Sequence, residues 1–214
     1  FFDVTNPATG EAIRRVPLSG AGEAAEAVNA AQAAQAAWAD MGLPARRVCL
    51  ANLADALDRY TGHFAKLLSE ECGFDEARAK AEVGAAVAAL HGAMVGQTGV
   101  FGLVLDASRP LASFAEIMAP AVMAGATLVV KPSPKAPSAV FALCELSSRA
   151  DWPAGVLNLL QGDTARLCTK LHFREMLEPT GLYEEAVTQG IQPMHQAMLA
   201  LLRGGLRVQS WPVP

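Results

Sequence analysis

Three short apolar segments in the middle of the chain decide the fold: VFGLVL at 100–105, TLVV at 127–130 and GVLNLLQ at 155–161. Each is a continuous run of the length that a strand needs, and such runs are typical of strands buried on both faces. Apolar helical patterns separate them, over 113–125 and 138–150. This β-α-β-α-β order predicts an α/β fold with a Rossmann-like parallel sheet and right-handed crossovers.

Before residue 100 the sequence predicts helices. Apolar residues recur there at intervals of three and four, which is the pattern of a helix with one buried face. These helices are expected at 23–40, 44–72 and 75–90. The first has an alanine-lined face, Pro44 suits the first turn of the second, and Gly73 suits its C-terminal cap. An alternating stretch at 11–18 follows a turn at 6–10 and predicts a strand or hairpin arm.

Composition and charge exclude several classes of protein. The chain has 214 residues, 52% of them hydrophobic and 18% charged, so it is too apolar to be intrinsically disordered. Because only 6% of the residues are aromatic, the apolar content is mainly Ala, Val and Leu, which favours helices packed on a sheet. A net charge of −4 provides no basic surface for a nucleic acid. No uninterrupted apolar run is long enough to span a membrane. We therefore expect a soluble, cytoplasmic protein with no nucleic-acid or membrane partner.

The cysteines and histidines form no recognisable metal or redox motif. The four cysteines lie far apart with no C-x-x-C pair, at Cys49, Cys72, Cys144 and Cys168. Such a set is typical of reduced, buried thiols. The histidines show no H-E-x-x-H spacing. We therefore predict no metal site.

A set of short motifs follows one another in a specific order along most of the chain. They are Asn6–Glu11, the alanine-rich helix ending at Trp38, Arg46, Glu71–Gly73, Ala119–Ser133, Trp152–Asn158 and Gly162–Asp163. In this order and spacing, the motifs resemble the N-terminal, cofactor-binding half of aldehyde dehydrogenases. The resemblance covers about residues 3–168 and implies a cofactor-binding domain at 1–168.

The resemblance implies a cofactor site that this sequence keeps only in part. The turn after the first strand, Asp106–Pro110, has no G-x-G-x-x-G glycines. In the family, the Lys of a K-P-S-E stretch binds the adenine ribose instead. Lys131 and Ser133 match that stretch, but Pro134 replaces the Glu and has no side-chain acceptor. We therefore predict a weak, degenerate site at Lys131 and Ser133, with weak NAD(P) binding or none. In the alternative interpretation, Lys131 is a solvated lysine at a strand end.

The catalytic residues that the resemblance implies have no match in this chain. Ser108 stands where the family has the Asn that stabilises the oxyanion, and losing such a donor costs on the order of 3 kcal/mol of transition-state stabilisation. Residues 169–214 contain no E-L-G-G-K and no cysteine, so the general base and the nucleophilic thiol that the resemblance implies are both missing. They also contain no F-T-G-S turn, whose helix N-terminus meets the pyrophosphate of the cofactor in the family. Cys168 is expected to be a buried or half-buried thiol. We predict no catalytic residue.

Residues 169–214 are predicted to form a short, divergent tail of helix and strand. An apolar stripe over Met194–Arg203 predicts a helix, and the strict alternation of Leu206–Trp211 predicts a half-buried strand. A terminal strand needs an edge to pair with, in its own sheet or in a neighbour's. The segment 84–99 is also shorter than its counterpart in the family.

Two functions remain open. In the first, the chain is a non-catalytic structural or assembly module of a longer aldehyde dehydrogenase. Its partner is then a catalytic aldehyde dehydrogenase domain, or a second copy in a homo-oligomer. In the second, it is the cofactor-binding portion of an NAD(P)-dependent aldehyde dehydrogenase whose catalytic half lies outside this chain. The divergent tail favours the first, and we expect the chain to be inactive by itself.

Overall fold

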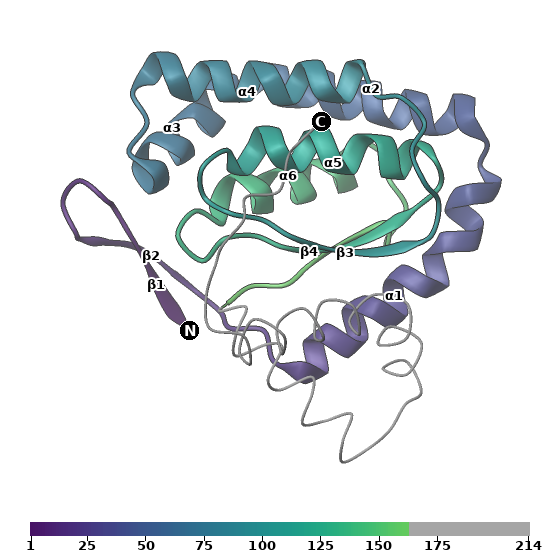
Figure 1. Cartoon of the computed structure of the whole chain (residues 1–214), viewed down its shortest axis with the longest axis horizontal. Helices are drawn as coiled ribbons and strands as arrows, with labels where there is room; N and C mark the ends of the chain where they lie inside the picture. The colour runs from purple at the N-terminus through teal and green to yellow at the C-terminus, as the bar shows by residue number, and fades with distance from the viewer. Residues whose placement is uncertain (163–214) are drawn as a thin grey trace, which may run out of the picture. The chain divides into compact units, whose positions relative to one another are not determined.

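The computed structural model describes residues 1–162, and these form a hairpin, a three-stranded sheet and six helices (Figure 1). In chain order the elements are β1 Phe2–Thr5, β2 Ala12–Val16, α1 Ala21–Asp40, α2 Leu43–Arg59, α3 Thr61–Cys72, α4 Glu76–His91, β3 Val100–Val104, α5 Pro110–Met123, β4 Thr127–Lys131, α6 Ser138–Arg149 and β5 Leu157–Leu159. The predicted tail helix and strand, Cys168 and the predicted boundary at residue 168 lie outside the described residues.

The first two strands form the hairpin. β1 and β2 pair antiparallel on either side of the turn predicted at 6–10, which confirms the hairpin arm predicted at 11–18. In Figure 1 the hairpin extends away from the helices and the main sheet. Arg14 on β2 ties it to α3 through ion pairs with Glu70 and Glu71. The ion pairs of Arg14 therefore attach the hairpin to α3.

Helices α1 and α4 lie where the apolar spacing predicts them, but the single helix predicted at 44–72 is in fact two. The break is at Tyr60, between α2 and α3, where the backbone leaves helical geometry. Next to it the Thr61 hydroxyl donates to the carbonyl of Asp58 at 2.7 Å, a local bond that competes with continuing the helix. The apolar spacing runs on across the break, so periodicity alone did not locate it. Gly73 caps α3 in the left-handed conformation, as predicted.

The sheet has the order β3-β4-β5, and its strands are parallel, as the alternating pattern predicts. All five residues of β4 are buried. β3 is an edge strand of this sheet, and the prediction that it is buried on both faces is wrong, because Val100 is 38% and Val104 60% exposed. An apolar run shows that a strand suits burial, but it does not show whether a neighbour is present on each side. β5 is shorter than the predicted strand at 155–161, and Gly155, with φ +89°, lies in the turn before it.

Helices cover both faces of the sheet (Figure 1). α1 contacts all three strands on one face, and α5 and α6 pack against β4 and β5 on the other. α2, α3 and α4 form a further layer that packs against α5 and α6. The main core has as its largest fully buried side chains, among others, Trp38, Phe64, Phe114, Leu53, Leu111 and Met118. A second, smaller core lies between α1 and the sheet, formed by Ala24, Ala31, Val129 and Leu160.

The close packing of α1 against the loop before β5 predicts that an added methyl group at Gly155 lowers the stability of the fold. A Cβ on Gly155 would lie 2.6 Å from the carbonyl oxygen of Ala30 and 2.8 Å from the Cβ of Ala34. We expect Gly155→Ala to lower the free energy of unfolding by about 1–3 kcal/mol, through overpacking and backbone strain. Gly84, inside α4, is the matched control because an added Cβ meets nothing within 4 Å there. Gly84→Ala should raise the free energy of unfolding by about 0.4–1 kcal/mol. Urea unfolding measures both, and a shift of the same sign in the two variants would contradict the packing described.

Candidate functional site

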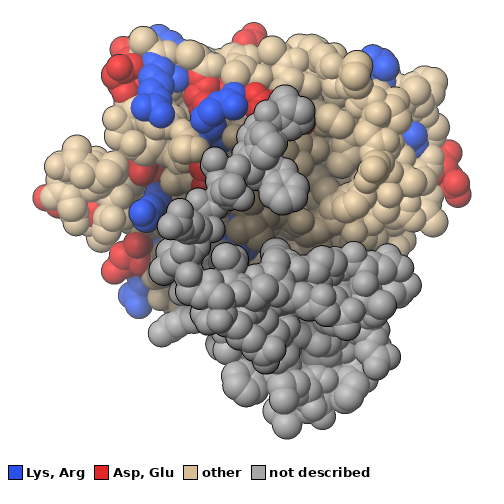
Figure 2. Space-filling model, viewed as in Figure 1, with Lys and Arg blue, Asp and Glu red and all other residues tan. Residues whose placement is uncertain are grey.

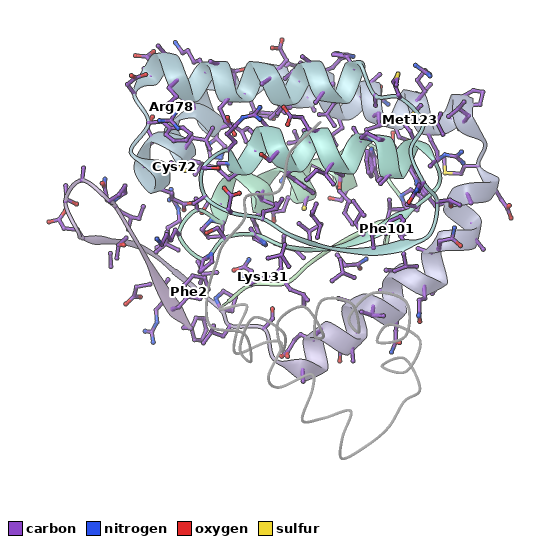
Figure 3. All side chains as sticks on the ribbon, in the orientation of Figure 1. Phe2, Cys72, Arg78, Phe101, Met123 and Lys131 are labelled. Carbon is purple, nitrogen blue, oxygen red and sulfur yellow. The ribbon has the colours of Figure 1, made fainter. Side chains whose placement is uncertain are left out.

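The carboxyl ends of β3, β4 and β5 meet at one edge of the sheet, and open α/β sheets bind their ligands at such an edge. The N–H of Leu105 donates to the carbonyl of Lys131 at 3.0 Å, which holds the ends of β3 and β4 in register. Figure 3 shows Lys131 at this end of β4 and Phe101 toward the opposite end of β3. The structure thus brings the turns after the three strands together, and with them the residues predicted from the sequence, Ser108, Lys131 and Ser133.

Lys131 and Ser133 are both buried at the end of β4. Lys131 is 3% exposed and its Nζ donates to the carbonyl oxygen of Pro132 at 2.7 Å, so it is not a solvated lysine. Ser133 is 7% exposed, and its Oγ accepts a hydrogen bond from the N–H of Lys135 at 3.3 Å. Pro134, in the same turn, has no side-chain acceptor. The turn therefore holds a cation and a hydroxyl, but no carboxylate that could accept hydrogen bonds from two ribose hydroxyls.

The turn after β3 is organised by a carboxylate. Oδ1 of Asp106 accepts from the N–H of Ser108 at 2.6 Å and from its hydroxyl at 2.5 Å. The hydrogen bond from the Ser108 hydroxyl, and to a smaller extent the one from the Ser108 N–H, hold the pKa of Asp106 below its ordinary value. The carboxylate is therefore ionised at neutral pH. The Ser108 hydroxyl is therefore already engaged by an anion. A developing oxyanion beside this turn would meet negative charge where an oxyanion hole provides donors.

The N-terminus of α5 is occupied by another of the chain's own carboxylates. Many nucleotide-binding sheets hold a phosphate at this kind of position. Here Glu82 of α4 is 8% exposed, and its Oε1 accepts from the N–H of Ala112, in the first turn of α5, at 3.0 Å. Its Oε2 lies 3.9 Å from Nε of Arg109, which also pairs with Glu116 at 2.7 Å. A phosphate at this helix end would be repelled by Glu82, so the first turn does not offer a pyrophosphate site.

The end of β5 is closed by the segment that leads into α1. The N–H of Ser19 donates to the carbonyl of Gln161 at 2.8 Å, and the N–H of Gln161 donates to Oγ of Ser19 at 2.9 Å. A Cβ on Gly162 would lie 2.8 Å from Cδ2 of Leu18, so the Leu18 side chain fills the space beside this glycine. Within the described part of the chain, Oε1 of Gln161 is buried without a hydrogen-bond partner. It is a single acceptor at the same edge as Lys131.

The described cysteines are not poised as nucleophiles. Burial raises the pKa of Cys49, with a smaller contribution from the charge of Asp151. Burial, and then the nearby Glu71 carboxylate, raise the pKa of Cys72 to about 12, and burial raises that of Cys144 to about 12. All three are therefore protonated at neutral pH, whereas the thiolate is the reactive form.

Neither a metal site nor a membrane span emerges from residues 1–162. No group of three His, Cys, Asp or Glu side chains in that range lies close enough to hold a metal ion. Over the same residues, no helix combines the length and the apolar composition needed to cross a bilayer. The candidate site therefore consists of the carboxyl edge of the sheet and its three turns.

Two residues that shape the site, Asp106 and Glu82, were not singled out from the sequence. Asp106 lies two residues before Ser108, a spacing at which an aspartate commonly bonds its own turn, and this was the available signal. Glu82 was visible only as a charged residue within a helix of small apolar residues. Its partner, the N-terminus of α5, lies 30 residues further along the chain. Together with Pro134, these two carboxylates mean that the described residues do not fit a complete dinucleotide site.

Comparison with protein families matches two models to the chain. The model of the aldehyde dehydrogenase family matches residues 1–98 and 96–175. The model of the C-terminal domain of the HTH-type transcriptional dual regulator CecR matches residues 154–207. The first match covers most of the chain and includes every element described above, whereas the second covers less than half of it.

Similar proteins match about three quarters of the chain. The succinate-semialdehyde dehydrogenase (NADP(+)) of Escherichia coli strain K12 is 31% identical over 193 residues, which cover 79% of this chain and 40% of that protein. The N-succinylglutamate 5-semialdehyde dehydrogenase of Caulobacter sp. is 34% identical over 179 residues, or 73% of this chain and 37% of that protein. The crystal structure of succinate-semialdehyde dehydrogenase from Burkholderia pseudomallei matches with a TM-score of 0.74 and 30% identity, over 79% of this chain and 40% of that one. The chain thus spans about two fifths of the length of the relatives it matches.

Proposed function

The chain belongs to the aldehyde dehydrogenase family, and from this we propose that it is a non-catalytic structural or assembly module of a longer aldehyde dehydrogenase. The proposal is carried by two carboxylates near the carboxyl edge of the sheet: that of Asp106, which is hydrogen-bonded to Ser108, and that of Glu82, which is buried. Asp106 engages Ser108 at the position of the missing oxyanion donor. Glu82 occupies the N-terminus of α5. Both carboxylates place negative charge where an active site would need donors to stabilise the negative charge that develops on the substrate.

A catalytic role for this chain alone would also need a nucleophile. Aldehyde oxidation through a covalent intermediate needs a thiolate to attack the carbonyl carbon and a base to activate the water that releases the acid. Burial keeps Cys49, Cys72 and Cys144 protonated. The covered length, about two fifths of the relatives, leaves room for these groups in the rest of a longer protein. The chain is therefore proposed to contribute scaffold and assembly rather than chemistry.

The second candidate is the cofactor-binding portion of an active NAD(P)-dependent aldehyde dehydrogenase. It is supported by the position of Lys131 and Ser133 at the carboxyl end of β4, and by the unpaired acceptor of Gln161 near the end of β5. The relatives named above include an enzyme whose name specifies NADP(+). In such a protein the bound cofactor would accept the hydride. Because Pro134 removes a ribose acceptor and the F-T-G-S turn that meets the pyrophosphate in the family has no match in this chain, we propose that the chain binds NAD(P) weakly or not at all.

The proposed partner is a catalytic aldehyde dehydrogenase domain or a second copy of this chain, and the tail at 204–214 provides a test. Its alternating apolar residues are expected to pair with an edge outside this domain. Deletion of 204–214 should lower the molar mass of the assembled protein measured by light scattering. As a matched control, Arg207→Ser with Gln209→Ser changes the polar side of the predicted strand and should leave the mass unchanged. A folded deletion variant with unchanged mass, alone and mixed with a catalytic partner, would remove the assembly role.

A further inference from the structure

A small cavity lies among the outer helices, away from the carboxyl edge of the sheet. Its volume is about 210 Å³, and it is lined by α2, by the end of α4 with the residues that follow it, and by the C-terminal end of α5. Figure 3 shows Met123 at this end of α5, away from Lys131. About 16 Å of helix separate Met123 from Ala112, whose N–H marks the other end of α5. The cavity is therefore separate from the candidate site described above.

The walls of the cavity are apolar. The apolar residues that line it are Leu50, Ala51, Leu90, Ala93 and Met123. Within residues 1–162, the one buried side-chain polar atom without a hydrogen-bond partner is Oε1 of Gln161, which lies at the carboxyl edge of the sheet. A polar group placed inside this cavity would therefore lose its hydrogen bonds to water without finding a side chain to replace them. The cavity suits a short aliphatic chain.

Two side chains that carry nitrogen stand at the edge of the cavity, Arg47 of α2 and His91 at the end of α4. Nε2 of His91 lies 3.4 Å from Oδ1 of Asp55, so the histidine already has an acidic partner. The guanidinium of Arg47 has no ion pair or hydrogen bond with another residue of the range 1–162. A guanidinium is always charged and binds a carboxylate through two parallel hydrogen bonds. The edge of the cavity thus provides one uncompensated cation.

The surface around the cavity carries little other charge. On the face shown in Figure 2, charged side chains gather over the hairpin and α3, and few lie toward the end where α2 begins and α5 ends. Val48, next to Arg47, and Met94, next to Ala93, are both apolar and exposed. An anion at Arg47 would therefore meet few competing carboxylates, and the nearby Asp55 is paired with His91.

We infer that this cavity binds a small aliphatic monocarboxylate, with its alkyl chain among Leu50, Leu90 and Met123 and its carboxylate paired with Arg47. The volume limits the length of the chain. Pockets for drug-sized ligands have about 300–1,000 Å³, so a smaller cavity suits an acid of up to about six carbon atoms. The inference goes beyond the proposed function and does not depend on it, because it involves neither the carboxyl edge of the sheet nor assembly.

Titration of the full chain with propanoate, butanoate, pentanoate and hexanoate tests the site, with binding followed by the shifts of the backbone amides in NMR spectra. Burial of one more methylene strengthens binding about fourfold, so the Kd should fall by about that factor for each added carbon atom. The amides of Ala51, Ala93 and Met123 should shift, and those of Lys131 and Ser133 should not. Hexanamide has the same chain without the charge and should bind at least tenfold more weakly than hexanoate.

Three other outcomes would overturn the inference. A Kd that is the same for all four acids would mean that an exposed arginine pairs with the anion and that the cavity takes no part. Shifts at Lys131 and Ser133 instead of Met123 would place the ligand at the carboxyl edge of the sheet. The absence of any shift would mean that the cavity of the full chain admits no such acid. None of these results would affect the proposed assembly function, whose test measures molar mass.

A charge variant tests the role of Arg47. Arg47→Gln should weaken hexanoate binding at least tenfold, because it removes a charge-assisted pair from an exposed position. Arg59 is the matched control, since it is exposed on the same helix and does not line the cavity. Arg59→Gln should bind hexanoate as the wild type does. Equal Kd values for the two variants, with both folded by circular dichroism, would contradict an anchor at Arg47.

A variant that fills the cavity tests the alkyl site independently of charge. Ala51→Leu adds apolar volume to the lining and should weaken hexanoate binding at least tenfold, with a smaller effect on propanoate. Asn52→Leu makes the same side chain at the next, exposed position and should leave both Kd values unchanged. Hexanoate binding of wild-type strength in Ala51→Leu would show that the alkyl chain lies outside the cavity.

Discussion

Replacing Arg46 by alanine is expected to lower the free energy of unfolding by about 2–5 kcal/mol. Arg46 lies in the first turns of α2 and is only 7% exposed. Its Nε donates to the carbonyl of Met123 at 3.0 Å, and its Nη1 donates to those of Trp38 at 3.1 Å and Ala39 at 2.5 Å. One guanidinium thus satisfies carbonyls at the ends of α1 and α5. Arg46 and Met123, which one of these contacts joins, lie 77 residues apart in the sequence.

The alanine variant leaves the carbonyls of Trp38 and Met123 without the side-chain donor that reaches them, in a buried site, whereas the carbonyl of Ala39 keeps the N–H of Gly42. An unsatisfied buried acceptor costs about 1–3 kcal/mol, and domains of this size have a total stability of about 5–15 kcal/mol. Arg47 is the control, because it is adjacent but exposed; Arg47→Ala should shift stability by no more than about 0.5 kcal/mol. Urea unfolding followed by tryptophan fluorescence compares the two. A loss below about 1 kcal/mol for Arg46→Ala would show that the guanidinium does not hold the helix ends together.

The purified chain is expected to produce no NADH or NADPH from succinic semialdehyde above the uncatalysed rate. The described thiols are protonated at neutral pH, and Ser108 is bonded to an ionised carboxylate instead of presenting a free donor. Without a thiolate no covalent intermediate forms, and losing one oxyanion donor alone costs about a hundredfold or more in rate. The E. coli relative, assayed under the same conditions, provides the positive control. Absorbance at the wavelength of the reduced cofactor measures both.

If the purified chain did oxidise the aldehyde, the activity would come either from a cysteine of this chain or from a contaminating enzyme. Cys168 is the one cysteine outside the described residues, so the Cys168→Ala variant is assayed beside the wild type. Steady turnover by the wild type that is lost in Cys168→Ala would contradict the non-catalytic function. Turnover that is equal in both proteins would indicate a contaminating enzyme, which a second purification step removes.

Most of the secondary structure was predictable because it depends on local patterns. The spacing of apolar residues predicts α1 and α4, Gly73 predicts the end of α3, and the alternation of strands and helices predicts the parallel sheet. The break at Tyr60 was not predictable, since the apolar spacing continues across it and the local bond from Thr61 to Asp58 leaves that spacing unchanged. The exposure of β3 was also missed. Its residues have the composition of an interior strand, and only the strand order shows that one side is open.

The sequence predicts those residues of the candidate site that can be identified from their position in a motif. Lys131, Ser133 and Ser108 were selected by their place in the sequence, and they lie at or after the carboxyl ends of β4 and β3. Cofactor binding by Lys131 and Ser133 stays a prediction. The roles of Glu82 and Arg46 required the fold, because their partners are backbone groups of distant helix ends. A charged residue on a helix is usually exposed, and the sequence offers no direct sign that these two face inward.

Titration of the purified chain with NAD and with NADP by calorimetry decides whether the chain binds a cofactor. We expect no saturable binding with a Kd below about 1 mM for either cofactor, because Pro134 removes the ribose acceptor and the F-T-G-S turn that meets the pyrophosphate in the family has no match in this chain. Pro134→Glu, which restores a carboxylate beside Lys131, should bind more tightly than the wild type. A micromolar Kd for the wild-type chain that is lost in Lys131→Ala would show that Lys131 and Ser133 suffice as a cofactor site, and would contradict the claim that this chain is a module without a working cofactor site.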